Sequence, residues 1–452
     1  MRIVIVGVGK VGKVLTEYLV QEGHDVVIID NDAKLIDESV NVFDVRGVVG
    51  NGASYEIQLE AEVNLADVMI AATSSDEVNI LCCLVGKKNG VKHTIARVRN
   101  PEYAKQIDFM HNELGLSMIV NPELEAANEI ARMLRFPSST KVDYFANGQA
   151  EIVEFKVPAK SVIVGKSLSQ IHNELNVRFL VSVVERNGNV YIPDGNFVLA
   201  ENDKVFVTSS LHEINQLFRK IGTFKHRARN VMIIGGGKIT YYLTKQLLAD
   251  GMKVKIIEIK PERCQELSEM LPDASIINAD GTSQEDLMEE GIKNSDALVT
   301  LTGLDEENIV ISLFAEMLKI PKVITKINHY SYSNILQSVG LDSTISPKAN
   351  TANHILRFVR SLENSLSQVK TLYRFLNNQV EASEFFIPNK TDYTNVPFRD
   401  LSLKPNTLIA CLIRNNHVII PNGNDWIEPN DSVVVVTTLP HLGDFEDVLK
   451  RN

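Results

Sequence analysis

Several features typical of membrane-embedded, secreted or metal-binding proteins are missing from this chain of 452 residues. Its longest apolar runs, such as MRIVIVGVG and the four valines at 433–436, are far shorter than the ~20 residues that a membrane-spanning helix needs. The chain begins in a strand-like run without a signal-peptide pattern, so we expect a cytoplasmic protein. Its four cysteines form no Cys-x-x-Cys pair, and no histidine lies near them at ligand spacing. We therefore expect neither a metal site nor a disulfide framework.

The chain also has no excess of positive charge, because its formal net charge is −11. A general nucleic-acid binder draws most of its affinity from lysine and arginine neutralising phosphates, so we expect no nucleic-acid partner. The hydrophobic content of 44% and charged content of 23% are typical of a soluble globular protein. At ~100–200 residues per domain, the length predicts two to four domains.

An internal repeat runs through the whole chain. Gly7 aligns with Gly235 at an offset of 228 residues, and VVIID, ending at Asp30, then aligns with VKIIE, ending at Glu258. Offsets within a few residues of this one align ATSSDEVN with LTGLDEEN, NPELEAANEIARML with SPKANTANHILRFV, and IPDGNFVLAENDKVFVTS with IPNGNDWIEPNDSVVVVT. The chain is therefore a tandem duplication of a unit of about 225 residues.

Each unit has two parts with different patterns. In the first part, short apolar runs such as RIVIVGV alternate with helical patterns such as DEVNILCCLVGKKNG, which predicts a Rossmann-like parallel sheet covered on both faces. The second part, with strand-like runs and turn signals such as RNGN, predicts a small α+β domain. The predicted fold is thus α/β, with two Rossmann-like domains alternating with two small ones. The expected domain ranges are 1–135, 140–221, 228–360 and 372–452, with one long helix over 355–376.

The first glycine-rich stretch predicts a dinucleotide site. Gly7-Val8-Gly9-Lys10-Val11-Gly12 fits G-x-G-x-x-G between a strand and a helix, where the glycines allow a tight turn, close approach of a pyrophosphate and close helix packing. Asp30 follows 21 residues after Gly9. Its carboxylate can accept both ribose hydroxyls and would repel a 2′-phosphate, so NAD is favoured over NADP. Lys10 either points to solvent or reaches a phosphate.

The second half repeats the stretch with one departure. Gly235, Gly236, Gly237, Lys238 and Ile239 lead into Thr240, which stands where the first half has Gly12, and Glu258 keeps the acidic position. A β-branched residue there should push the helix off the sheet, so we expect the second site to differ in ligand preference or occupancy.

Further candidates follow the predicted strands, whose carboxyl ends line the ligand crevice of such sheets. In the first half these are Asn51, Gly52, Ala53, Thr73, Ser74 and Arg97; in the second half they are Asp280, Gly281, Thr302, Gly303 and Lys326. Helix capping is an alternative explanation for Thr73 and Ser74. Arg97 either meets a phosphate or pairs with Asp76.

Together these motifs resemble the domain pair that regulates conductance in potassium channels and transporters. The duplicated arrangement is similar to the TrkA family, the peripheral cytoplasmic subunits of Trk potassium-uptake systems, over essentially all of the chain. The resemblance implies NAD or NADH in the first site and adenine nucleotides such as ATP or ADP in one or both sites. It also implies a ring of subunits beneath a membrane-embedded potassium channel, with the segments 122–134 and 347–359 as crossover helices.

Two other functions remain open. An NAD-dependent oxidoreductase would need a proton-transfer residue beside the nicotinamide, and none of the ten histidines has a spacing that indicates catalysis. We therefore expect no enzyme activity and no catalytic residue. A nucleotide sensor that acts on a partner unrelated to potassium is the other alternative.

Overall fold

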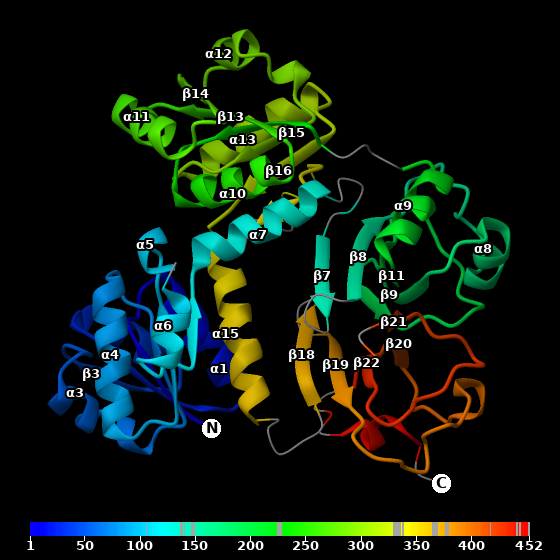
Figure 1. The fold of residues 1–452 in the computed structure, drawn as a ribbon, viewed down its shortest axis with the longest axis horizontal. Coiled ribbons are helices and arrows are strands. Elements are labelled where there is room, and N and C mark those ends of the chain that lie inside the picture. The colour runs from blue at the N-terminus through cyan, green and yellow to red at the C-terminus, as the bar shows by residue number, and fades with distance from the viewer. Residues whose placement is uncertain are drawn as a thin grey trace. The chain divides into compact units, whose positions relative to one another are not determined.

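In the computed structural model the chain forms two compact units (Figure 1). One unit contains residues 1–131 and 229–359, and the other contains residues 132–228 and 360–452. The described residues are 1–452 except 105, 136–138, 140, 146–149, 224–227, 329–335, 337–338, 364–368, 376–378, 416, 440–441, 443 and 451–452.

The first Rossmann-like domain alternates strands and helices along the chain. Its elements are β1 (Arg2–Val6), α1 (Lys10–Gln21), β2 (Asp25–Asp30), α2 (Ala33–Val42), β3 (Arg46–Val49), α3 (Tyr55–Glu60), β4 (Val68–Ala71), α4 (Asp76–Asn89), β5 (His93–Arg97), α5 (Pro101–Ala104), α6 (Ile107–Asn112), β6 (Met118–Val120) and α7 (Pro122–Arg135). The parallel strands lie in the order β3-β2-β1-β4-β5-β6. Because helices cover both faces of such a sheet, central strands such as β1 and β4 are almost wholly apolar and buried.

The second Rossmann-like domain repeats this order. Its elements are β12 (Asn230–Ile234), α10 (Lys238–Ala249), β13 (Lys253–Glu258), α11 (Pro261–Met270), β14 (Ser275–Asn278), α12 (Gln284–Glu289), β15 (Ala297–Thr300), α13 (Asp305–Met317), β16 (Lys322–Lys326), β17 (Thr344–Ile345) and α15 (Pro347–Glu363). The strand order β14-β13-β12-β15-β16-β17 matches the first sheet strand for strand. In each sheet the order reverses beside the first strand, and ligands of such folds bind at that point.

The second unit holds two small five-stranded antiparallel sheets. The first comprises β7 (Lys141–Phe145), β8 (Ala150–Lys156), β9 (Leu180–Arg186), β10 (Asn189–Tyr191) and β11 (Lys204–Ser209), with helices α8 (Leu168–Leu175) and α9 (Leu211–Lys220). The second comprises β18 (Val369–Phe375), β19 (Val380–Phe386), β20 (Thr407–Arg414), β21 (His417–Ile419) and β22 (Ser432–Thr437), with 3₁₀ turns at Phe398–Asp400 and Phe445–Val448. One buried cluster joins the two sheets through Val183 and Phe206 of the first and Ala410 and Val434 of the second.

The same ion pair recurs in both small domains. In the first, the Arg186 guanidinium donates to both oxygens of Asp203, each at 2.7 Å. In the second, Arg414 donates to both oxygens of Asp431 at 2.9 and 2.8 Å. Each aspartate side chain is buried and also accepts a backbone N–H. The duplication therefore extends to the small domains in their packing as well as their sequence.

The last helix of each Rossmann-like domain lies against the other domain of the pair. Figure 1 shows α7 beside α10 and α15 beside α1. The Asn121 amide, directly before α7, donates to the Tyr242 hydroxyl of α10 at 3.0 Å, and the Gln246 amide of α10 donates to Asn128 at 2.7 Å. These contacts make the two Rossmann-like domains one unit.

The fold class predicted from the sequence is confirmed, with one wrong detail. The helix expected over 355–376 ends at Glu363 as α15, and residues 369–375 form strand β18. The domain ranges stay a prediction, and two of their limits, residues 140 and 452, lie outside the described residues. Among the described helices, none is both long enough and apolar enough to cross a membrane.

Candidate nucleotide-binding site

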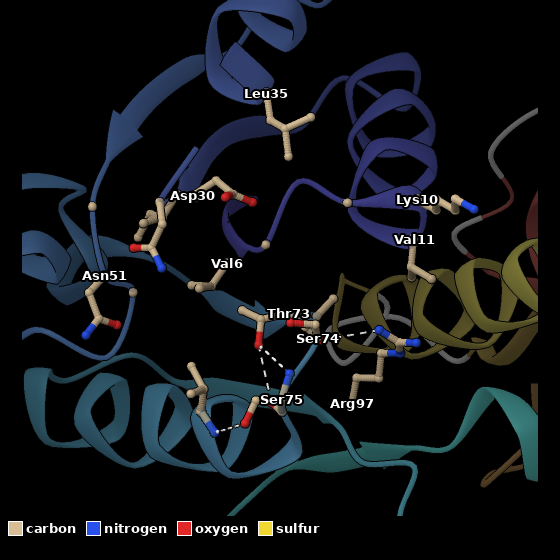
Figure 2. Close-up of a pocket in the computed structure, with 18 of the residues that line it drawn as sticks. Val6, Lys10, Val11, Asp30, Leu35, Asn51, Thr73, Ser74, Ser75 and Arg97 are labelled. Carbon is tan, nitrogen blue, oxygen red and sulfur yellow. Dashed lines mark hydrogen bonds between the residues drawn. The ribbon is translucent and has the colours of Figure 1, made fainter. Parts of the chain in front are cut away.

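A cavity of about 530 Å³ lies at the carboxyl ends of the central strands of the first sheet (Figure 2). It is lined by the glycine loop after β1, the end of β2 and the turns after β3 and β4, together with Arg97 at the end of β5. Figure 2 shows Asp30 and Asn51 on one side of the cavity and Lys10 and Arg97 on the other. The position is the one where strand order reverses, which is the ligand crevice of this fold class.

The three glycines of the loop meet three different requirements. Gly7 has φ +94°, and a Cβ there would lie 2.8 Å from the Thr73 backbone nitrogen. A Cβ on Gly12 would lie 2.0 Å from the Gly7 carbonyl oxygen, so helix α1 approaches the loop only because Gly12 has no side chain. Gly9 differs, because nothing lies within 4 Å of its Cβ position and its φ is −70°. Its missing side chain therefore leaves room at the cavity, beside the free N–H groups that begin α1.

The Asp30 carboxylate is held in place by backbone donors. The Val8 N–H donates to Oδ2 at 2.7 Å, and the Asp32 N–H donates to Oδ1 at 3.0 Å. Each carboxylate oxygen can accept more than one hydrogen bond, so both remain able to accept ribose hydroxyls. The backbone thus fixes the acidic group at the cavity wall before any ligand arrives.

A buried asparagine ties together the ends of β4 and β5. The Thr73 N–H and hydroxyl donate to Asn79 Oδ1 at 2.8 and 2.7 Å, and the Asn79 amide donates to the Arg97 carbonyl at 2.8 Å. Asn308 repeats this in the second half, accepting the Thr302 N–H and donating to the Lys326 carbonyl. The asparagine in both aligned motifs was available as a signal, but the sequence alone assigned it no role.

Asp76 forms its ion pair with Arg99, although its charge also favours the charged form of Arg97. Asp76 accepts the backbone N–H groups of Arg99 and Asn100 at 2.8 and 2.7 Å and faces the Arg99 guanidinium. The Arg97 guanidinium donates to the Thr73 carbonyl at 3.2 Å, and its Nε is buried without a hydrogen-bond partner. Burial, and then the charge of Arg99, lower the pKa of Arg97. Arg97 is therefore a partly desolvated cation at the cavity wall.

Most of the residues predicted for the first site line the cavity: Gly7, Gly9, Lys10, Val11, Asp30, Asn51, Gly52, Thr73, Ser74 and Arg97. Val8, Gly12 and Ala53 do not; Val8 and Gly12 support the loop through the contacts described above. Gly52 has a packing role as well, since a Cβ there would lie 2.2 Å from Val6. Ser75, which belongs to the same strand-end cluster as Thr73 and Ser74, also lines the cavity, and so do Leu35 and Lys348, which sequence reasoning missed.

The second half builds a similar loop with different contacts. Gly235 has φ +100°, and the Gly237 Cβ position is as open as that of Gly9. The longer Glu258 side chain accepts the Gly236 N–H at 2.6 Å. Arg263 stands where the first half has Leu35, and its Nε donates to the Gly236 carbonyl at 2.7 Å. The second glycine loop is thus hydrogen-bonded to an arginine, whereas the first cavity is lined by a leucine at the same position. Sequence reasoning overlooked this difference.

Thr240 changes the junction between loop and helix. Its side chain is fully buried, and its hydroxyl donates to the Gly235 carbonyl. In the first half the equivalent carbonyl lies so close to Gly12 that no Cβ fits. The two junctions therefore differ in geometry. The expected difference in ligand preference or occupancy stays a prediction.

The remaining second-half candidates lie at strand ends. The Lys326 ammonium donates to the Thr302 carbonyl, as Arg97 does to that of Thr73, and burial lowers the pKa of Lys326. Asp280 accepts the Thr282 N–H and hydroxyl, which lowers the pKa of Asp280. Gly281 packs on Ile234, as Gly52 packs on Val6. The Cβ position of Gly303 is open, and Lys238 and Ile239 begin α10 as Lys10 and Val11 begin α1.

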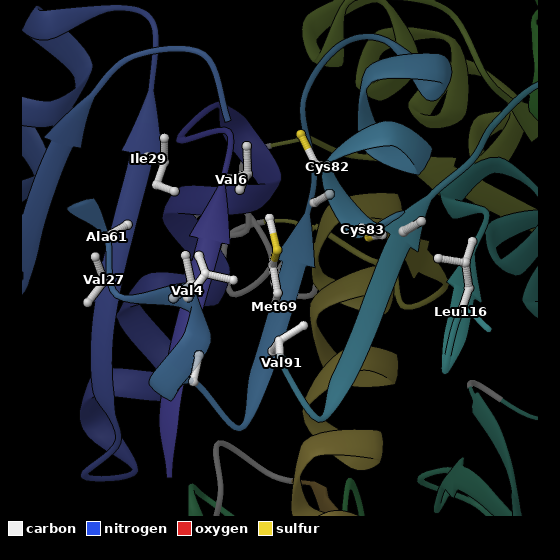
Figure 3. Packing of buried hydrophobic residues seen from close by; sticks show 14 of the residues in the cluster. Val4, Val6, Val27, Ile29, Ala61, Met69, Cys82, Cys83, Val91 and Leu116 are labelled. Carbon is white, nitrogen blue, oxygen red and sulfur yellow. The ribbon is translucent and has the colours of Figure 1, made fainter. Parts of the chain in front are cut away.

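The cysteines take no part in this site. Cys82 and Cys83 belong to the apolar core beneath the sheet, among residues such as Val6 and Met69 (Figure 3). Burial raises the pKa of Cys82 to about 12 and that of Cys83 further. Thiols in this state are poor nucleophiles, because the reactive form is the thiolate. Among the described residues, no group of three or more His, Cys, Asp or Glu side chains could hold a metal ion.

Comparison with known proteins places the chain in a family. The family model of the TrkA-N domain matches residues 3–122 and 231–347, and that of the TrkA-C domain matches residues 152–222. The chain belongs to the TrkA family. Both Rossmann-like domains thus correspond to TrkA-N domains, and the first small domain corresponds to a TrkA-C domain.

Relatives within the TrkA family align over the full chain. A Trk system potassium uptake protein TrkA homolog of Archaeoglobus fulgidus is 34% identical, with 100% of both chains covered. The Trk system potassium uptake protein TrkA of Haemophilus influenzae is 30% identical over 96% of this chain and 95% of its own. A solved structure of the GsuK channel bound to NAD shares the fold, with a TM-score of 0.64 at 18% identity over 96% of this chain and 76% of that one.

Proposed function

We propose that this protein is a nucleotide-binding regulatory subunit of a potassium-uptake system. NAD or NADH occupies the first site, and the bound nucleotide changes the opening of a membrane-embedded potassium channel. The proposal rests on the TrkA family membership and on the names of the full-length relatives, which are Trk system potassium uptake proteins. The protein acts at the cytoplasmic face of the membrane without catalysing a reaction.

The observation that carries the ligand assignment is the pairing of Gly9 and Asp30 on one cavity. The open Cβ position of Gly9 gives a pyrophosphate access to the backbone N–H groups, while Asp30 presents carboxylate oxygens to the ribose. The same carboxylate would repel a 2′-phosphate, which favours NAD over NADP. A channel of this fold has been solved with NAD bound, which agrees with the assignment.

Adenine nucleotides are the second ligand class. ADP and ATP share the adenosine and the first two phosphates with NAD, so they fit the same glycine loop and the same acidic residue. We expect them to compete with NADH at the first site, and ADP or ATP to be the ligand of the altered second site. Arg263 and Thr240 are the residues that distinguish the second site from the first.

We also propose an assembly of the protein beneath the channel, supported by its membership of the TrkA family. Several copies form a ring beneath the channel, and two ligand states of the ring correspond to two states of the channel. A nucleotide shifts such an equilibrium only through its different affinities for the two states, typically by ~1–3 kcal/mol for each site.

Reconstitution tests the proposal. The full chain would be added to proteoliposomes that contain the membrane subunit purified with it, and rubidium uptake would be measured with and without NADH. We expect NADH to change the uptake rate by roughly 5- to 150-fold, the range of such coupling energies. The change should vanish in Asp30→Ala. An uptake rate that is the same with and without NADH would refute the proposal. A pull-down from the membrane fraction that recovers only partners unrelated to transport would refute it as well.

The oxidoreductase alternative is tested with the same preparation. NADH absorbance would be followed in the presence of a panel of carbonyl substrates. We expect no turnover, because the described residues that line the cavity include no histidine or tyrosine placed for proton transfer.

A further inference from the structure

One residue of the first cavity comes from the other half of the chain. Lys348 is the second residue of α15, which belongs to the second Rossmann-like domain, yet its side chain lines the first cavity together with Gly9, Lys10 and Arg97. Figure 2 shows the ribbon of α15 passing beside Val11 and Arg97. The first cavity is therefore completed by the second half of the chain.

The side of the cavity that Lys348 joins is cationic. Among the residues that line the cavity, three carry positive charge, Lys10, Arg97 and Lys348, and one, Asp30, is acidic. Asp30 lies on the opposite side from Lys10 and Arg97. Lys10 and Lys348 line the same cavity, and burial, followed by the positive charge of Lys10, lowers the pKa of Lys348. An anion bound in the cavity would favour the charged forms of both.

The protein contacts of Lys348 use only some of the hydrogen-bond donors of its ammonium group. Its ammonium group donates to the Asn328 carbonyl at 3.3 Å, and the nearby Asp305 carboxylate favours its charged form. Asp305 itself accepts the Asn328 N–H at 2.8 Å through each of its oxygens. An ammonium group has three donors, so Lys348 can also bind a ligand in the cavity.

Comparison of the two halves of the chain shows that only the second half has a lysine at the position of Lys348. Alignment of NPELEAANEIARML with SPKANTANHILRFV places Glu123 of α7 at the position of Lys348. Glu123 has one buried carboxylate oxygen without a hydrogen-bond partner, and its charge favours the protonated forms of both Lys326 and Arg97. The helix that crosses to the first site thus carries a cation, whereas the helix that crosses to the second domain carries an anion.

We propose that Lys348 binds the terminal phosphate of a nucleoside di- or triphosphate in the first site, so that the nucleotide bridges the two halves of the chain. This rests on the proposed nucleotide binding at that site. A ribose held at Asp30 directs its phosphates across the glycine loop toward Lys10, Arg97 and Lys348. The bound nucleotide then contacts both α15 and the first domain. Nucleotide binding can therefore stabilise one arrangement of the two Rossmann-like domains.

Calorimetry on the full chain tests the phosphate contact. Adenosine, ADP and ATP would be titrated into the wild type, Lys348→Met, Lys348→Arg and the control Lys88→Met, which removes one positive charge from an exposed position on α4. We expect Lys348→Met to weaken ADP and ATP by roughly 10-fold or more, as for a charged hydrogen bond, and to leave adenosine unchanged. Lys348→Arg should restore most of the affinity, and Lys88→Met should match the wild type.

Hydrogen exchange tests the bridge. ADP should slow amide exchange in residues 349–359 of the wild type, and this protection should be lost in Lys348→Met at saturating ADP, although the melting temperature of the free protein is unchanged. Equal ADP affinity in the wild type and Lys348→Met would overturn the phosphate contact while leaving the nucleotide site standing. A wild type that binds none of the three ligands would overturn this proposal together with the proposed binding of adenine nucleotides. Unchanged exchange in 349–359 on ADP binding would overturn the bridge.

Discussion

Replacing Gly9 with alanine separates a binding role of the glycine loop from a structural one. Gly9 is the N-cap of α1, has φ −70° and is exposed, and nothing lies within 4 Å of where its Cβ would stand. The new methyl group therefore enters open space in the free protein. That space is the one through which a pyrophosphate would approach the backbone.

The expected magnitudes differ widely for folding and for binding. Alanine is a poorer N-cap than glycine but restricts the unfolded chain, and these opposing effects of ~0.5–1 kcal/mol leave the free energy of unfolding nearly unchanged. Losing one charged hydrogen bond between a phosphate and a backbone N–H costs about 1.5–3 kcal/mol, which is roughly 10- to 150-fold in affinity.

The assay is calorimetry with NADH, ADP and adenosine, together with thermal unfolding. Gly237→Ala is the matched control for NADH at the first site, because its Cβ position is equally open but lies in the second glycine loop. We expect Gly9→Ala to lose NADH and ADP affinity at the first site and to keep its melting temperature. Adenosine, which has no phosphate, should bind as in the wild type. Full NADH affinity in Gly9→Ala would refute the placing of the pyrophosphate at this loop.

Three further changes test the packing described above. Gly12→Ala places a Cβ 2.0 Å from the Gly7 carbonyl oxygen, so we expect at least ~1–3 kcal/mol of destabilisation in chemical denaturation; wild-type stability would contradict this packing. Asp203→Ala removes the charged hydrogen bonds between Arg186 and its buried partner and should cost about 1.5–3 kcal/mol by the same method; an unchanged midpoint would show that the pair contributes little. In the native protein a thiol reagent should modify at most Cys264, which alone of the four cysteines is not buried, and rapid modification of more than one thiol would disprove the burial of the others.

The fold was predictable because the short apolar runs, the glycine loop and the duplication all indicate the same architecture. Apolar runs such as RIVIV and VVIID are too short for buried helices, and the glycine loop with Asp30 indicates the order of the elements around β1. The duplication then doubles each signal, since every motif is seen twice.

The prediction of one long helix over 355–376 was wrong because the apolar spacing of α15 continues into strand β18. Val369, Leu372 and Tyr373 fit either a helix or a strand, and pairing decides between them: Leu372 lies opposite Ser383 and Tyr373 opposite Ala382 in β19. Such pairing with a segment further along the chain is not visible in local periodicity.

The site was predictable where its residues belong to the loop or the strand ends, and not where they come from elsewhere. Lys348 resembles any lysine in the first turn of a helix until α15 is seen to cross to the first domain. Arg263 likewise resembles an ordinary surface residue of α11. In both cases the comparison of the two halves held a signal, lysine against glutamate and arginine against leucine, but only the structure relates these differences to the sites.

The most direct test of the central claim is the titration of NADH into the full-length wild type and into Asp30→Ala. Loss of the carboxylate removes the acceptors for both ribose hydroxyls, while the second-half acid Glu258 stays in place. The account predicts that the wild type binds NADH, that NADPH binds more weakly, and that Asp30→Ala loses the NADH site. NADH binding of equal affinity in Asp30→Ala would contradict it.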